Sequence, residues 1–121
     1  MIDADFGAAT VLITMGAVLG KVNAYQLLFI ATIETCFAAL NYTLTYTVYG
    51  AADIGGSCWI HMFGGLFGLM VSWTYKNPKK EEQKFAASSY HSNLFAFVGT
   101  MFLWLYWPSF NAALQTGNSK H

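Results

Sequence analysis

Apolar residues fill four long stretches of the chain, and polar residues interrupt those stretches only rarely. An α-helix needs about 17 to 25 mostly apolar residues to cross the hydrocarbon core of a bilayer. The pattern therefore predicts an all-α, polytopic protein with about four membrane-spanning helices, of which the first is short. We expect these spans at about residues 5–19, 24–48, 53–75 and 92–110.

The segments between the predicted spans differ in length. Gly20–Asn23 and Gly50–Ala52 are short and contain residues that favour turns. The segment 76–89 is long and rich in lysine and glutamate, so we expect it to be solvated. Pro108 lies near the end of the fourth span, where a helix tolerates proline. No internal repeat or domain boundary is visible, so residues 1–121 are predicted to form one unit.

Composition supports a membrane protein. The chain is 55% hydrophobic and 10% charged, whereas an average soluble domain is roughly 25% charged. The formal net charge is zero, so there is no basic field that would attract nucleic acid. We therefore expect a lipid bilayer around the chain and no nucleic-acid partner. Cys36 and Cys58 lie in or beside apolar stretches and are expected to be buried free thiols.

The distribution of lysine predicts the orientation in the membrane. Four crossings place Lys21 and the lysines of 76–84 on one side, and Asp3, Asp5 and Asp53 on the other. Loops on the cytoplasmic side are enriched in Lys and Arg. The third span is therefore expected to run from outside to inside, with Asp53 at its outer end. Lys120, in the C-terminal tail, does not fit this count.

His61 is the residue of the third span with the clearest chemical potential. On a helical wheel Ser57, His61, Gly64, Gly68 and Ser72 fall within roughly 80° of one another. Small residues on one face allow another helix to approach closely. An ionisable group at membrane depth is by default a candidate functional residue. A histidine that is hydrogen-bonded between helices for packing alone is the alternative.

Two carboxylates also have more than one interpretation. Asp53 precedes the start of a helix, so it can cap the backbone amides there, or attract a cation to the outer mouth, or do both. Glu34 lies near the middle of the second span, in a loose polar stripe with Gln26, Asn41 and Thr45. We favour hydrogen bonding between helices for Glu34 over a role in a proton relay.

Five motifs carry a resemblance to a known family. They are Asp3–Phe6, Gly16–Lys21, Asp53–Ser57, Ile60–Leu69 and Asn93–Asn111. Together they extend over the whole chain, which resembles the Rh glycoprotein branch of the ammonium transporter family. The resemblance implies a fold of eleven or twelve helices built from inverted repeats, assembled as a homotrimer with one pore in each subunit. This chain would be a partial one that supplies roughly the third to sixth of those helices.

The resemblance also implies roles for individual residues. Phe6 and Phe110 match the two phenylalanines that close the outer end of the family's pore. Asp53 matches the outer aspartate that supports cation recruitment, and His61 matches the first of two paired pore histidines. The second pore histidine belongs to a helix in the other half of the family fold and is absent here. His91 is expected at the inner edge of the last span and His121 in the tail, so neither can take its place.

The chain departs from the family pattern at both expected pore mouths. Tyr42 stands where the family usually has an acid, and Asn93 stands where it usually has aspartate. Both changes remove negative charge. We therefore expect weaker attraction of ammonium than in relatives, with Asp53 still present.

The expected function is passage of ammonium or ammonia through a hydrophobic, histidine-lined pore, in the plasma membrane and without enzymatic activity. A charge at the centre of a bilayer costs from about 3 to more than 10 kcal/mol, so an apolar pore rejects Na⁺ and K⁺. Ammonium can instead release its proton and cross as neutral ammonia. We expect no metal and no cofactor, since haem needs two axial ligands and only His61 lies at suitable depth. The alternative is a small four-helix membrane subunit with an assembly or regulatory role.

Overall fold

The computed structural model describes residues 2–75 and 87–112, with side chains from residue 5 onward. All regular structure in these ranges is helical, which confirms the predicted all-α class. Two π-helical segments, η1 and η2, continue or precede α-helices, so that 24–48 and 57–74 are each one unbroken helix. The elements are α1 (Ile2–Val18), α2 (Ala24–Thr43), η1 (Leu44–Val48), η2 (Ser57–Met62), α3 (Phe63–Thr74) and α4 (Tyr90–Ala112).

The second helix begins where the sequence predicts, and a capping box explains why. The side chain of Asn23 accepts a hydrogen bond from the Gln26 backbone amide at 2.9 Å. The side chain of Gln26 in turn accepts one from the Asn23 amide at 2.9 Å. These bonds satisfy backbone donors that the first helical turn leaves open. Gln26 therefore serves the start of the helix and does not join the polar stripe that contains Glu34.

The third helix begins later than the sequence suggests. We expected it from about residue 53, but η2 starts at Ser57. The residues before it form a turn that ends at Gly56, whose φ of 71° lies in the left-handed region. Glycine adopts this conformation without the steric penalty that a Cβ atom brings. The turn leaves Asp53 free to cap the helix from outside.

Glycines let α1 and α3 approach closely. Gly64 and Gly68 are both buried. A Cβ atom on Gly64 would lie 2.9 Å from the Thr10 carbonyl oxygen, and one on Gly68 would lie 3.0 Å from the Thr14 Cα atom. Real Cβ atoms need more space than this. The two glycines of the predicted stripe therefore form a helix–helix contact, as in other close membrane-helix packings.

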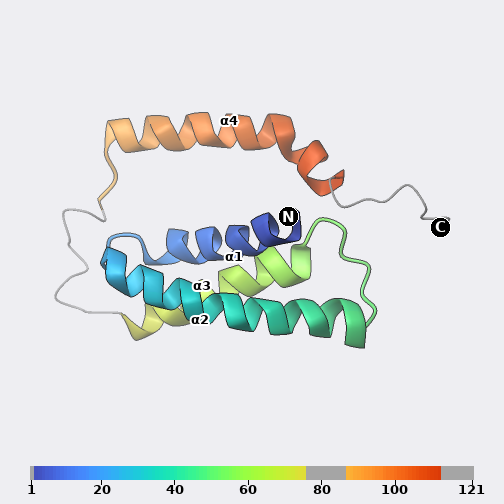
Figure 1. Cartoon of the computed structure of the whole chain (residues 1–121). Coiled ribbons are helices and arrows are strands. Elements are labelled where there is room, and N and C mark those ends of the chain that lie inside the picture. Colours follow the sequence, from blue (N-terminus) through green and yellow to red (C-terminus); the bar gives the residue numbers. More distant parts are fainter. Residues whose placement is uncertain (1, 76–86, 113–121) are drawn as a thin grey trace.

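Figure 1 shows α1, α2 and α3 as one packed group, with α4 beside it. The C-terminal end of α4 approaches the N-terminal end of α1. Most side chains of α4 are exposed in the described structure. Phe110 and Asn111, near its end, are partly buried. The candidate site therefore lies between α1 with η2 on one side and the C-terminal half of α4 on the other.

Length and composition mark one described helix, Ala24–Val48, as able to cross a membrane, and Asp5–Val18 is a shorter apolar helix. Lys21 donates a hydrogen bond to the Ser72 hydroxyl at 2.6 Å, at the end of α3 opposite Asp53. Lys21 and Asp53 thus lie at opposite ends of the helix 57–74, which agrees with the prediction that they face opposite sides of the membrane. The lysines of 76–84 and Lys120 lie outside the described residues.

The thiols differ from expectation in one respect. Cys36 and Cys58 are free, as predicted, but both are exposed. The prediction of burial was wrong because apolar stretches of a membrane helix present side chains on all faces, and only some of those faces meet another helix.

Candidate functional site

Asp53 caps the helix that carries the candidate histidine. Its Oδ1 atom accepts a hydrogen bond from the Ser57 amide at 2.6 Å. Its Oδ2 atom accepts from the Cys58 amide at 2.7 Å and the Trp59 amide at 3.3 Å. Only 7% of the residue is exposed. The carboxylate therefore accepts hydrogen bonds from three backbone amides that have no partner within the helix, at the positive end of the helix dipole.

Aromatic residues fix the turn that holds Asp53. The Tyr46 hydroxyl donates to the Asp53 carbonyl oxygen, and the Trp59 indole N–H donates to the Tyr46 hydroxyl at 3.1 Å. Tyr42 packs edge-on against Trp59, with ring centroids 4.9 Å apart. Sequence reasoning missed this set. Its signal was the spacing of Tyr42 and Tyr46, which places both rings on one face at the end of the second helix.

Phe6 and Phe110 meet across the structure. Their ring centroids are 4.8 Å apart and the rings are nearly perpendicular, at 68°. Phe6 is 7% exposed and belongs to a buried cluster with Trp59 and Ile60. Edge-to-face contact of this kind is a favoured arrangement for aromatic rings. The structure thus brings together the two residues that were expected to form a gate, one from the start of α1 and one from the end of α4.

His61 lies beside this aromatic pair. Its ring centroid is 6.0 Å from that of Phe110 and 5.5 Å from that of Trp107. The Nε2 atom is buried and has no hydrogen-bond partner among the described residues. A buried polar nitrogen without a partner is costly in a structural histidine. The geometry thus gives little support to a role in packing alone.

The His61 ring borders an apolar cavity of about 640 Å³ between α1 and α4. Side chains of both helices line it, including Ile13 from α1 and Tyr106 from α4. Within the described residues, His61 is the only ionisable side chain in this lining apart from the Tyr106 phenol. The lining therefore combines a largely apolar surface with two groups able to form hydrogen bonds, the His61 imidazole and the Tyr106 phenol.

Trp107 is a site residue that the sequence did not single out. Its ring stacks on Phe110 with centroids 5.1 Å apart and 14° between the planes. It also contacts His61 and lines the cavity. The last span is rich in aromatic residues, and the sequence alone does not distinguish Trp107 from the others. The three-residue separation of Trp107 and Phe110 was the available signal, since it places both on one helix face.

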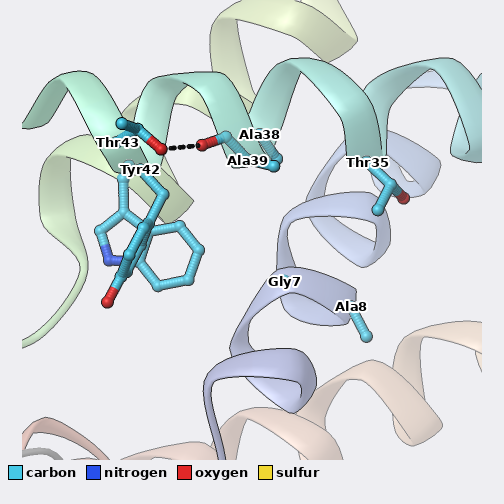
Figure 2. A pocket seen from close by; sticks show the side chains of 8 residues that line it. Gly7, Ala8, Thr35, Ala38, Ala39, Tyr42 and Thr43 are labelled. Atoms are coloured by element: carbon cyan, nitrogen blue, oxygen red, sulfur yellow. Dashed lines mark hydrogen bonds between the residues drawn. The ribbon is translucent and has the colours of Figure 1, made fainter.

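A second cavity, of about 560 Å³, lies between α1 and α2. Figure 2 shows Thr35, Ala38 and Tyr42 on α2 across from Gly7 and Ala8 on α1. The lining contains no carboxylate or cationic side chain. The tyrosine that replaces the expected acid therefore leaves this cavity uncharged.

The remaining candidates lie away from the aromatic cavity. His91 and Asn93 are exposed in the first turn of α4, at the end opposite Phe110. His91 packs against its neighbour Tyr90. Among the described residues, no group of three or more His, Cys, Asp or Glu side chains could hold a metal ion.

Comparison with known proteins settles the family. The sequence model of the Ammonium Transporter Family matches residues 1–121. The chain belongs to the ammonium transporter family. Ammonium transporters of Rh type B from Danio rerio and Homo sapiens are 49% and 50% identical over the whole of this chain. The chain spans 27% of the length of each of these relatives.

Membership of the ammonium transporter family confirms the resemblance stated above and two coarser predictions. The family consists of polytopic, integral membrane transporters, so the four described helices belong to a membrane protein of that kind. The second prediction confirmed is that the chain belongs to a family of transport proteins.

Proposed function

We propose that the whole protein conducts ammonium or ammonia across a membrane and that these residues form one side of its pore. The observation that carries the proposal is the unpaired His61 nitrogen beside an apolar cavity, next to the Phe6–Phe110 pair. The relatives that match the chain from end to end are named as ammonium transporters, which supports the same substrate.

The proposed selectivity follows from dehydration. An apolar passage offers Na⁺ or K⁺ nothing in place of hydration water, and a charge at membrane depth costs several kcal/mol. Ammonium has a route that those ions lack, because it can release one proton and continue as neutral ammonia. In this scheme the Phe6 and Phe110 rings exclude bulk water, and the His61 imidazole exchanges hydrogen bonds with ammonia inside the cavity.

The proposed role of Asp53 is to shape the outer mouth and to favour cations there. Both carboxylate oxygens are bonded to backbone amides. An arriving cation therefore experiences the field of the carboxylate more than direct contact with it. Because Tyr42 adds no charge beside the second cavity, Asp53 is the acid on which cation recruitment would depend.

Assembly and location follow the family resemblance. We propose a homotrimer in the plasma membrane, with one pore in each subunit. The alternative, a small subunit that transports nothing, is not favoured, because the whole chain matches proteins that are named as transporters.

A substitution at His61 tests the proposed pore. In the whole natural protein, His61→Leu should reduce ammonia-dependent alkalinisation of proteoliposomes by about tenfold, because the cavity loses its hydrogen-bonding group at a cost of about 1 to 3 kcal/mol. Leu69→Ala, on an exposed position of the same helix, is the matched control. Trimer assembly and thermal stability should match wild type in both variants. Unchanged ammonia flux in His61→Leu would refute the pore role.

A further inference from the structure

Glu34 is an unusual residue for its position. It lies near the middle of the long helix 24–48 and is fully buried. Its Oε1 atom is 2.5 Å from the Thr14 hydroxyl oxygen on α1. Its other oxygen, Oε2, is buried and has no hydrogen-bond partner among the described residues. The pore proposed above does not use this carboxyl group.

Thr14 also contacts a third helix. Its hydroxyl oxygen, fully buried as well, lies 3.1 Å from the Gly64 carbonyl oxygen. The Thr14 hydroxyl thus stands between a carboxyl group of α2 and a backbone carbonyl of the helix that carries His61. This close approach is possible because Gly64 has no side chain to separate α1 from α3.

Counting protons decides the state of the carboxyl group. A threonine hydroxyl has one hydrogen to donate. If Glu34 were ionised, its carboxylate and the Gly64 carbonyl would both be acceptors. The single Thr14 hydrogen could then serve only one of them, and the other short contact would have no hydrogen between its two oxygen atoms. The carboxylate would also carry a full charge with one hydrogen bond at membrane depth, which is strongly unfavourable.

No described charged group compensates such a charge. Glu34 is the only charged residue of α2, and α3 contains none. The described charged residues of α1 lie in its first turn, and the ring of His61 in η2 faces Trp107 and Phe110. Lys21, in the turn after α1, is exposed and bonds the Ser72 hydroxyl near the far end of α3. Neither α1 nor α3 therefore offers a cation at the depth of Thr14.

We propose that Glu34 is a neutral carboxylic acid and the first donor in a hydrogen-bond chain across three helices. Its hydroxyl donates to Thr14, and the Thr14 hydroxyl donates to the Gly64 carbonyl. Each proton then has one acceptor, and both short distances are accounted for. This hydrogen-bond chain ends at Gly64, three residues beyond His61, so Glu34 and Thr14 are positioning residues that fix the depth of the histidine. The importance of His61 rests on the proposed function, whereas the protonation state does not.

The proposal separates Glu34 from a proton relay. The chain of hydrogen bonds ends on a backbone carbonyl, which has no proton to pass on. A neutral, proton-donating substitute should therefore serve as well as the acid. Glutamine is that substitute, because its amide N–H₂ can donate to Thr14 and its size is nearly the same.

Infrared spectroscopy of the whole natural protein in lipid vesicles tests the protonation state directly. At neutral pH the wild type should show the C=O stretching band of a protonated carboxyl group, and Glu34→Gln should lack that band. Thr14→Val should shift it, because the acceptor of the carboxyl proton is removed. Absence of the band from the wild type, or its persistence in Glu34→Gln, would overturn the proposal, and neither reading depends on what the protein transports.

Transport and stability measurements test the positioning role. Glu34→Gln should retain ammonia flux within about twofold and keep the pH profile of the wild type, because the hydrogen-bond chain is intact. Thr14→Val should lower flux by about fivefold or more, and Thr14→Ser should restore it. Thr32→Val is the matched control, since the exposed Thr32 hydroxyl bonds only the Leu28 carbonyl of its own helix in the described structure. Loss of flux in a folded Glu34→Gln protein, or equal flux in Thr14→Val and Thr32→Val, would refute the proposed hydrogen-bond chain.

Discussion

At the scale of single residues, two buried acids of this protein have different environments. Asp53 accepts three backbone hydrogen bonds at the start of a helix, where a negative charge is favourable. Glu34 has one hydroxyl neighbour and no helix end nearby. The same functional group is therefore held by backbone donors at one position and by a single side-chain hydroxyl at the other.

A pair of substitutions at Asp53 separates its cap from its charge. Asp53→Asn keeps an acceptor for the helix start, so we expect a folded protein whose half-saturation for ammonium rises severalfold. Asp53→Ala removes every cap bond and should lower the free energy of unfolding by about 2 kcal/mol. Ammonium-dependent flux and denaturant unfolding in micelles measure the two effects.

The control for the charge is Asp5→Asn, on an exposed position of α1 at the same end of the molecule. It removes one negative charge without touching the cap. Equal half-saturation for ammonium in wild type and in Asp53→Asn would show that the field of the carboxylate is not needed for recruitment.

At the scale of elements, the contact of α1 with α3 sets the position of the site. Gly64 and Gly68 let the two helices approach until backbone atoms are nearly in contact. That approach places the Thr14 hydroxyl against the Gly64 carbonyl. It also fixes α1, with Phe6 at its start, relative to the helix that presents His61.

Adjacent glycines of α3 offer a matched test of this contact. Gly64→Ala should destabilise the protein by about 1 to 3 kcal/mol, because the new Cβ atom would meet the Thr10 carbonyl and force the helices apart. Gly65→Ala has open space around it and should be neutral or stabilise by up to about 1 kcal/mol, since alanine favours helix. Thermal unfolding in detergent compares the two; equal midpoints would contradict the close approach.

The sequence predicts the elements better than it predicts the directions in which their side chains point. Apolar stretches locate the four helical stretches of the described residues. A wheel with 100° steps assumes an α-helix, whereas 57–62 is π-helical and turns less per residue. Ser57, expected on the stripe with His61, is the first residue of this segment and is exposed.

The candidate site shows the same limit of sequence reasoning. Asp53 and His61 could be named from their positions in the sequence, whereas Phe6 and Phe110 could be named only through the family resemblance. Trp107 could not be chosen from the aromatic residues of the last span, since a single helix does not reveal which of its faces meets a partner. That choice depends on packing between α1, α3 and α4, which arises only when the whole chain is folded.

At the scale of the whole molecule, a small aromatic contact joins α4 to the packed group of α1, α2 and α3. Phe110 packs against Phe6, and Trp107 packs against His61. The remaining described side chains of α4 are largely exposed. The cavity beside His61 therefore has one wall whose position depends on a few rings near its outer end.

A double-mutant cycle tests that joint. Phe6→Leu and Phe110→Leu should each destabilise the protein, and their combined effect should be smaller than the sum by about 1 kcal/mol, the coupling typical of an aromatic pair. Phe6→Leu combined with Phe95→Leu is the control, because Phe95 is exposed near the other end of α4. Denaturant unfolding in micelles supplies the free energies; additive effects for Phe6 and Phe110 would refute the contact.

Because α4 contacts the other described helices mainly near its C-terminal end, substitutions in its two halves should have different effects. Substitutions near residue 110 should alter contacts within the described structure, because the aromatic rings there border the cavity. Changes between residues 90 and 100 meet little of the described structure, so any strong defect that they cause would locate a neighbour outside it. A mutational scan along this single helix would thus map, position by position, where the protein depends on itself and where it depends on what surrounds it.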